Sequence, residues 1–207
     1  MRLGIMGGTF DPIHLGHLFI AEEARVRFDL EKVVFVPNGI PPHKREYETT
    51  RASHRFAMVR VAIHQNPDFS CSAIEVQRPG PSYTVETLRE MRQQFPEAEF
   101  FYITGIDAIS EILSWAEHEE VVRLATFIAA MRPGFEPVSL LEKLPVAYLE
   151  RILVLNSTGI GISSSEIRAR VRGQMPIRYL TPDGVCEYIF RFGLYRQAEA
   201  SAQAGGE

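Results

Sequence analysis

Short runs of apolar residues, rich in β-branched and aromatic side chains, recur along the chain between longer segments of mixed character. Because these runs are continuous rather than alternating, they predict strands that are covered on both faces of a sheet. The predicted strands are residues 3–6, 32–37, 99–104, 126–131 and 151–156, with 71–76 as a further candidate. The intervening segments with helical character are 15–29, 51–65, 83–94, 106–123 and 163–172.

The order of strand and helix predicts an α/β fold, a Rossmann-like, doubly wound parallel sheet with helices on both faces. Ligands of such sheets bind beyond the carboxyl ends of the strands. No internal repeat or interdomain linker interrupts the pattern, and 45% hydrophobic residues supply an ample core. We therefore expect a single domain over residues 1–197. The segment 198–207 has no large apolar residue, which predicts a disordered tail.

Two predicted helices carry clear start signals. Ser163, with Glu166 three residues later, has the form of a capping box. Thr181 followed by Pro182 has the form of a cap with proline at the first helical position.

Composition narrows the class of protein. The net charge of -4 and the pI near 5.9 give no broad basic face for nucleic acid or anionic lipid. The apolar runs are far shorter than the roughly 20 residues of a membrane span, and the first residues lack a signal-peptide pattern. Cys71 and Cys186 are too few and too far apart for a disulfide framework or a zinc site. We expect a cytoplasmic protein with no nucleic-acid or membrane partner, and whether it forms a homo-oligomer stays open.

The stretch GIMGGTFDPIHLGH, residues 4–17, carries the first candidate chemistry. If the first strand ends at Gly7 and Gly8, the backbone there can approach a ligand closely. A helix beginning near His14 would direct its free amide groups and the positive end of its dipole at the same spot. His14 and His17 are three residues apart, so both imidazoles would share one face and could donate to one anion.

Each of these features alone is more often structural, since a glycine pair commonly forms a turn and a lone histidine commonly packs. Their combination favours a phosphate site. A dehydrogenase would need Gly-x-Gly-x-x-Gly here, and a Walker loop would need Gly-Lys-Ser/Thr; the stretch has neither.

A second candidate anion site lies in GISSSEIR, residues 161–168. Glycine and serines at a helix start offer amides and hydroxyls, and Arg168 follows one turn later with a guanidinium that can bind phosphate oxygens. On this segment alone, an ordinary capped helix with a solvent-facing arginine is the more common explanation. Lys44, in a proline-stiffened loop, either adds charge at this end of the sheet or is an ordinary surface residue.

Three further features are ambiguous without context. The segment SYTVETL, residues 82–88, starts a helix whose free amides and Thr84 hydroxyl could receive a carboxylate or phosphate, although ordinary capping by Ser82 explains it equally well. Trp115, the only tryptophan, would by default pack in the core. The histidines at 43, 54, 64 and 118 fit no metal spacing.

Taken together, the motifs resemble the bacterial nicotinate-nucleotide adenylyltransferases, within the nucleotidyltransferase superfamily that carries a His-x-Gly-His motif. The resemblance covers nearly the whole chain except the tail. The segments that carry it are GGTFDPIHLGH at 7–17, VPNGIPPHK at 36–44, RPGPSYTVETL at 78–88, ITGIDAISEILSW at 103–115 and GISSSEIR at 161–168. The family often has Ile-Ser-Ser-Thr where this chain has Ile-Ser-Ser-Ser at 162–165, which exchanges one hydroxyl for another.

The resemblance implies a nucleotidyltransferase domain that joins ATP and nicotinate mononucleotide to give nicotinate adenine dinucleotide and pyrophosphate, a step of NAD biosynthesis. It implies Mg2+ carried with ATP, no metal site on the protein, and a preference for nicotinate over nicotinamide. The implied catalytic residues are His14, His17 and Arg168. The implied ATP-binding residues are Gly7, Gly8, Thr9, Phe10, Lys44, Gly105, Asp107, Ile162, Ser163 and Ser164. The implied nicotinate-nucleotide-binding residues are Tyr83, Thr84 and Trp115, whose ring would stack on the nicotinate.

Other functions stay open at this point. The phosphopantetheine adenylyltransferases usually have threonine where this chain has His14, and they lack the PPHK and SYTVETL segments. A non-catalytic nucleotide sensor would keep the fold without turnover, which the joint retention of His14, His17 and Arg168 disfavours. A nicotinamide-cofactor oxidoreductase would have to bind its dinucleotide without the expected glycine pattern.

Overall fold

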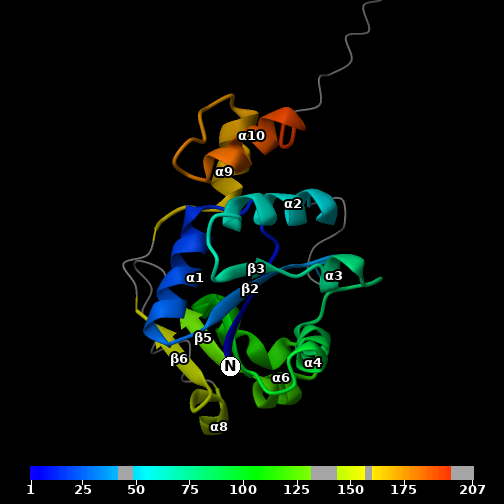
Figure 1. Ribbon diagram of the computed structural model, residues 1–207, viewed down its shortest axis with the longest axis vertical. Coiled ribbons are helices and arrows are strands. Elements are labelled where there is room, and N and C mark those ends of the chain that lie inside the picture. Colours follow the sequence, from blue (N-terminus) through cyan, green and yellow to red (C-terminus); the bar gives the residue numbers. More distant parts are fainter. Residues whose placement is uncertain (42–48, 132–143, 157–159, 197–207) are drawn as a thin grey trace, which may run out of the picture.

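The computed structural model describes residues 1–41, 49–131, 144–156 and 160–196. Within them, six parallel strands form one sheet in the order β3-β2-β1-β4-β5-β6 (Figure 1). The strands are β1 Arg2–Gly8, β2 Lys32–Pro37, β3 Phe69–Cys71, β4 Glu99–Gly105, β5 Thr126–Ala130 and β6 Ile152–Leu155. Lys44 and the predicted tail lie outside the described residues.

Helices cover both faces of the sheet, as the continuous apolar runs predict. They are α1 Leu15–Arg27, α2 Ala52–Ile63, α3 Ile74–Gln77, α4 Thr84–Gln94, α5 Ile106–Ser110, the 3-10 turn η2 Ile112–Ser114, α6 His118–Leu124, α8 Val146–Leu149, α9 Ser164–Arg172 and α10 Asp183–Arg191. Figure 1 shows α1 and α2 on one side of the sheet and α4 and α6 on the other, with α9 and α10 beyond α2.

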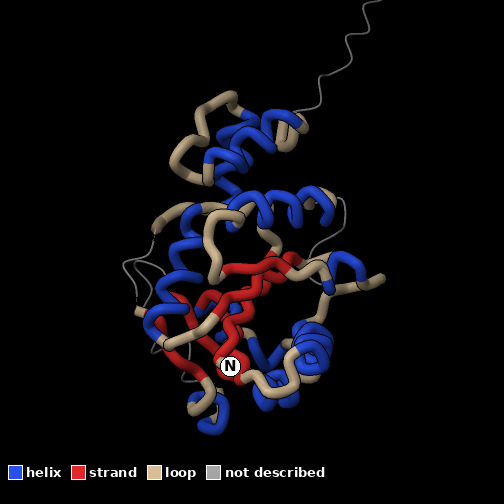
Figure 2. Tube along the Cα trace, in the orientation of Figure 1, coloured by secondary structure: helices blue, strands red, loops and turns tan. Residues whose placement is uncertain are grey.

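Two apolar clusters form the core, one on each face of the sheet, and Figure 2 shows the strands enclosed between helices. Strand β4 illustrates the division, because Phe101 and Ile103 join the cluster under α1 and α2 while Phe100 and Tyr102 join the cluster under α4 and α6. This arrangement confirms the predicted Rossmann-like α/β fold. No helix of the described part of the chain has both the length and the apolar content that a membrane crossing needs.

The predicted strand at 71–76 is wrong in its bounds. Strand β3 ends at Cys71, and the chain then forms the short helix α3. The helical turn points Glu75 inward, where its carboxylate accepts a hydrogen bond from Thr87 Oγ1 at 2.5 Å. The chain therefore forms a helical turn that buries Glu75 against Thr87, and not the strand that the apolar residues favour.

The single helix predicted over 106–123 is also wrong, because the segment forms α5, η2 and α6. The hydroxyls of Ser110 and Ser114 each donate to a carbonyl oxygen three residues earlier, at 2.6 and 2.7 Å. Such bonds compete with the helical ladder. The chain then turns through an extended Trp115 and a left-handed Glu117 before α6 begins.

The helix starts were predicted with mixed success. Ser163 is the N-cap of α9, and its hydroxyl accepts from the Glu166 amide at 3.1 Å, as predicted. Thr181 does not cap α10, whose N-cap is Pro182. The Thr181 hydroxyl instead donates to the Ile13 carbonyl oxygen at 2.8 Å and ties the start of α10 to the turn before α1.

Gly7, at the end of β1, has no room for a side chain, because a Cβ there would clash with the Tyr102 hydroxyl of β4. We expect Gly7→Ala to lower the free energy of unfolding by about 1–3 kcal/mol, the usual cost of overpacking. The cost should shrink when Tyr102→Phe removes the hydroxyl. Urea denaturation of both single variants and the double variant measures this coupling.

Gly161 supplies the control for this prediction, since a Cβ there would meet no atom within 4 Å. Gly161→Ala should therefore leave stability nearly unchanged. An equal cost of Gly7→Ala with and without the Tyr102 hydroxyl would contradict the assigned clash.

Candidate active site

The predicted site residues that the structure describes, all but Lys44, gather at the carboxyl edge of the sheet, around the ends of β1 and β4. These two strands are neighbours, although most of the first half of the chain separates them in sequence. From β1 the chain proceeds outward to β2 on one side, and from β4 it proceeds to β5 on the other. The carboxyl ends of β1 and β4 therefore mark the topological switch point of the sheet, where doubly wound sheets bind their ligands.

The two histidines lie together at the start of α1. Their rings stack with centroids 3.7 Å apart and planes inclined by 24°. His14 is the N-cap of the helix, and its backbone amide donates to His17 Nδ1 at 3.3 Å. Because Nδ1 accepts this bond, a neutral His17 carries its ring proton on Nε2. The predicted shared face is confirmed, and Nε2 is the atom through which His17 can donate to an anion.

The turn between β1 and α1 is closely packed around Phe10. Phe10 is buried in a left-handed conformation with φ 49°, which is uncommon for a residue with a side chain. Its ring meets His17 edge-on at 5.1 Å. Its ring atoms also lie 3.0–3.2 Å from the position that a Cβ of Gly8 would take. The lack of a side chain at Gly8 therefore leaves room for the Phe10 ring to pack against His17.

Helix α9 is hydrogen-bonded to the same turn, so the two segments predicted to bind anions lie together. Arg168 donates through Nη1 to the Asp11 carbonyl oxygen at 2.7 Å and through Nη2 to Ser165 Oγ at 3.3 Å. Ser164 Oγ donates to the Pro12 carbonyl oxygen at 2.8 Å. These bonds place the guanidinium of Arg168 beside the turn that leads to the histidines. The hydroxyls of Ser163 and Ser164 thus serve the protein's own backbone.

Arg55, which the sequence did not single out, holds the loops that follow β1 and β2. Only 1% of it is exposed. Its guanidinium donates to the carbonyl oxygens of Thr50 at 2.8 Å, Thr9 at 2.8 Å and Gly39 at 2.7 Å, and to Asn38 Oδ1 at 2.8 Å. Burial lowers the pKa of this group, and the nearby Asp11 carboxylate opposes that shift. The available signal was its position on the apolar face of α2, three and four residues before Met58 and Val59.

Asp11 provides a buried negative charge beside this arginine. It is 4% exposed. Its Oδ2 accepts from the Thr50 amide at 3.1 Å, and its Oδ1 accepts from the Tyr195 hydroxyl at 2.7 Å. No local pattern in the sequence indicates this role of Asp11, because its partners lie 39 and 184 residues away.

A second group of predicted residues meets at the hydroxyl of Tyr102. Burial raises the pKa of this hydroxyl, and the nearby Thr84 side chain opposes that rise. The hydroxyl also lies where a Cβ of Gly7 would be. The Trp115 ring packs edge-on against Tyr102 at 6.2 Å and against Phe127 at 6.1 Å. Trp115 is partly buried, so it packs on the core while leaving surface for a ligand. One hydroxyl thus brings a predicted ATP residue and a predicted nicotinate-nucleotide residue together.

The buried carboxyl of Glu75 contacts the first turn of α4 through Thr87. This carboxyl is 5% exposed, and its burial raises its pKa above the usual range for glutamate. It accepts a hydrogen bond from the Thr87 hydroxyl, and the nearby Ser82 side chain opposes the rise in its pKa. Ser82 Oγ accepts from the Gly39 amide at 2.9 Å. Ser82 therefore does not cap α4, whose N-cap is Tyr83. Tyr83 itself is 38% exposed.

The remaining predicted residues lie at the carboxyl end of β4, at the start of α5 and just before α9. Gly105 is the N-cap of α5, and the carboxylate of the exposed Asp107 folds back so closely that a Cβ on Gly105 would meet its Oδ1. Ile162 is partly buried against the core. Among the described residues, no cluster of three or more His, Cys, Asp or Glu side chains could hold a metal ion.

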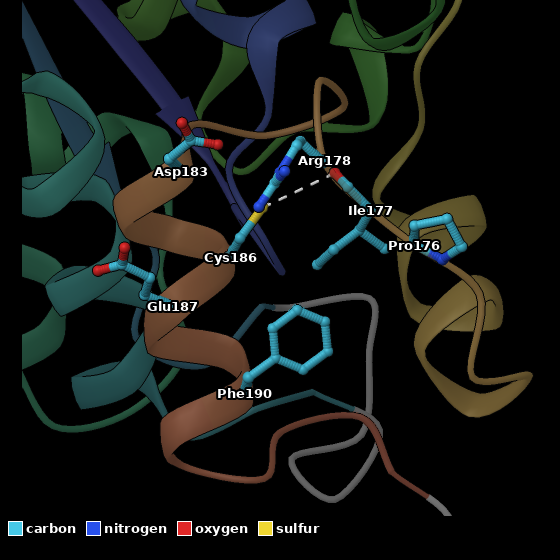
Figure 3. A pocket seen from close by; sticks show the side chains of 7 residues that line it. All are labelled: Pro176, Ile177, Arg178, Asp183, Cys186, Glu187 and Phe190. Carbon is cyan, nitrogen blue, oxygen red and sulfur yellow. Dashed lines mark hydrogen bonds between the residues drawn. The ribbon is translucent and has the colours of Figure 1, made fainter.

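A hollow of about 400 Å³ lies elsewhere, between α10 and the segment before it (Figure 3). Its lining residues are Pro176, Ile177, Arg178, Asp183, Cys186, Glu187 and Phe190. The Cys186 thiol donates to the Ile177 carbonyl oxygen at 3.8 Å, as the dashed line in Figure 3 shows. None of the predicted site residues lines it, so it is distinct from the site at the strand ends.

A parallel sheet with stacked histidines at its switch point and an arginine from a later helix beside them defines an α/β protein of the nucleotidyltransferase class. Residues 5–170 match the family model described as cytidylyltransferase-like. The chain belongs to the cytidylyltransferase-like family and, within it, to the nicotinate-nucleotide adenylyltransferases.

Relatives and solved structures support this assignment. A probable nicotinate-nucleotide adenylyltransferase of Moorella thermoacetica is 50% identical over 199 residues, covering 94% of this chain and 92% of the relative. Another from Desulfitobacterium hafniense is 48% identical over 198 residues, covering 94% and 96%. The structure of Plasmodium falciparum nicotinic acid mononucleotide adenylyltransferase complexed with NaAD has a TM-score of 0.73 at 21% identity, covers 94% and 97% of the two chains, and shows the shared fold.

Proposed function

We propose that this protein transfers the adenylyl group of ATP to nicotinate mononucleotide, giving nicotinate adenine dinucleotide and pyrophosphate in NAD biosynthesis. The observation that carries the proposal is the stacked pair of His14 and His17 at the start of α1, with Arg168 beside the same turn. The family of the chain supports the choice of substrates, since its relatives carry the name of this activity.

The reaction needs no nucleophile from the protein. The 5'-phosphate of the mononucleotide, already an anion at neutral pH, attacks the α-phosphorus of ATP. A new P–O bond forms there, and the bond from the α-phosphorus to the oxygen that bridges to the β-phosphate breaks. Pyrophosphate leaves with that electron pair. Catalysis therefore rests on positioning the two phosphates and neutralising their charge.

The histidines and the start of α1 supply donors for this purpose. In our proposal, His17 donates through Nε2 to the phosphate oxygens whose charge grows as pyrophosphate leaves, and His14 stacks against it and serves the same anion. The start of α1 adds the positive end of its dipole. Arg168, one turn into α9, extends the positive charge to the outer phosphates.

Other predicted residues complete the two subsites in this proposal. The ATP subsite comprises Gly7, Gly8, Thr9, Phe10, Lys44, Gly105, Asp107, Ile162, Ser163 and Ser164. The nicotinate-nucleotide subsite comprises Tyr83, Thr84 and Trp115. Mg2+ would be bound mainly through the phosphates of ATP, since magnesium keeps most of its waters and needs few protein carboxylates. A cytoplasmic location is part of the proposal and agrees with two free cysteines.

Incubation of the protein with MgATP and nicotinate mononucleotide tests the function directly. Nicotinate adenine dinucleotide and pyrophosphate should appear in equal amounts, and a chelator should stop the reaction. A parallel incubation with nicotinamide mononucleotide measures the preference for the acid. Nucleotide binding without either product would favour a sensor over an enzyme.

His17→Ala should lower the catalytic rate by about 100- to 1,000-fold, the usual loss for one preorganised donor, while ATP affinity changes much less. His17→Asn should recover part of the rate, because asparagine keeps a neutral donor and can accept from the His14 amide. Steady-state kinetics and calorimetric titration with ATP separate the two effects.

His64→Ala is the matched control, since His64 is an exposed residue at the end of α2, and it should react at the parent rate. A folded His17→Ala enzyme that turns over near the parent rate would make the histidine pair structural and refute the proposed role.

Trp115→Ala should raise the Michaelis constant for nicotinate mononucleotide about tenfold or more, because ring stacking on a base contributes about 1–3 kcal/mol. The constant for ATP should not change. Trp115→Phe should lose less, since it keeps an aromatic face.

Leu113→Ala, at a neighbouring exposed residue, provides the kinetic control. Urea denaturation run beside the kinetics distinguishes stacking from packing. A loss of about 3–5 kcal/mol in stability with unchanged Michaelis constants would assign Trp115 to the core alone.

A further inference from the structure

The C-terminal turn of the described chain returns to the first turn of the site. After α10, Gly193 and Tyr195 both take left-handed conformations, with φ of 61° and 64°. These two turns bring the Tyr195 hydroxyl to 2.7 Å from Asp11 Oδ1, across 184 residues of sequence. Because a left-handed conformation costs energy for a tyrosine, the contact at its end has to offset that cost.

The acceptor of this bond is the residue that holds Arg168. The Asp11 carboxylate accepts from Tyr195 and from the Thr50 amide, while the backbone carbonyl oxygen of Asp11 accepts from Arg168 Nη1 at 2.7 Å. With the carboxylate held at both oxygens, the peptide that follows Asp11 has a fixed orientation. The carbonyl that positions the guanidinium is therefore fixed as well.

The Tyr195 hydroxyl is suited to a permanent tie. The phenol is partly buried, and burial together with the Asp11 charge raises its pKa above the ordinary tyrosine range. It consequently remains a protonated donor at neutral pH. A hydrogen bond to a charged acceptor is about twice as strong as one between neutral groups.

We propose that Tyr195 is a positioning residue for adenylyl transfer, which sets the orientation of Arg168 through Asp11 and thereby makes the C-terminal turn part of the ATP subsite. This inference rests on the proposed function. Tyr195 itself touches no substrate in this account, and its effect reaches ATP only through the arginine.

Tyr195→Phe removes the hydroxyl and keeps the ring, so the variant tests the hydrogen bond with little change in packing. The catalytic efficiency with ATP should fall about tenfold, the loss expected for one hydrogen bond to a charged group. The Michaelis constant for nicotinate mononucleotide should stay unchanged, because Thr84 and Trp115 are held by Tyr102 instead. A thermal melt verifies folding.

Coupling to Arg168 distinguishes positioning from a general structural role. In an Arg168→Ala background, Tyr195→Phe should have little further effect, since the residue through which it acts is gone. A structural role would give the same loss in both backgrounds. Tyr188→Phe is the matched control and should keep the parent kinetics. Tyr188 lies on α10, before the C-terminal turn, and its hydroxyl is hydrogen-bonded to His54 Nδ1 on α2 at 3.0 Å, away from Asp11.

Parent kinetics for Tyr195→Phe, or an equal loss with and without Arg168, would overturn the inference while leaving the proposed function intact. If the parent protein makes no dinucleotide, the proposed function fails instead. The affinity for MgATP, measured by calorimetry, then provides the test. It is compared among the parent protein, Tyr195→Phe, Arg168→Ala and the double variant, and the same coupling between Tyr195 and Arg168 is expected.

Discussion

The buried guanidinium of Arg55 is the interaction on which the site depends. A charge removed from water is costly unless every donor finds a partner, and Arg55 finds four acceptors in segments that have no regular structure of their own. Because the buried guanidinium needs all of these acceptors, it holds the loops after β1 and β2 in one arrangement. Burial lowers the pKa of Arg55, and the nearby Asp11 carboxylate opposes that shift because it attracts the positive charge.

The rest of the site is built outward from these fixed loops. Asp11 joins the helix that carries Arg168 to the turn that carries the histidines. The carbonyl oxygen of Gly39 accepts from Arg55, and the amide of Gly39 donates to Ser82. The segment before α4 is therefore connected to Arg55 through Gly39. Tyr102 then joins α4 to β1 through Thr84 and Gly7. The two proposed subsites thus share one hydrogen-bonded support, which is what a reaction driven by positioning requires.

Local patterns in the sequence predicted the parts of this structure that local physics decides. Continuous apolar runs predicted the parallel strands, Ser163 predicted its helix start, and the spacing of His14 and His17 predicted their shared face. The contacts of Arg55, Asp11, Glu75 and Tyr195 were missed because each depends on partners that only the folded chain brings together. The break within 106–123 was missed for a different reason, since serine side chains that bond their own backbone overrode the apolar spacing.

Native-state hydrogen exchange in Arg55→Lys tests the central claim most directly. The amides of Asn38, Gly39 and Thr50 bond to Gly8, Ser82 and Asp11, so their protection reports the order of the loops around Arg55. Lysine keeps the charge but cannot make the same four bonds, and these amides should exchange about tenfold faster or more. The amides of β1 and β4 should keep their protection. Unchanged protection of the three loop amides would contradict the account.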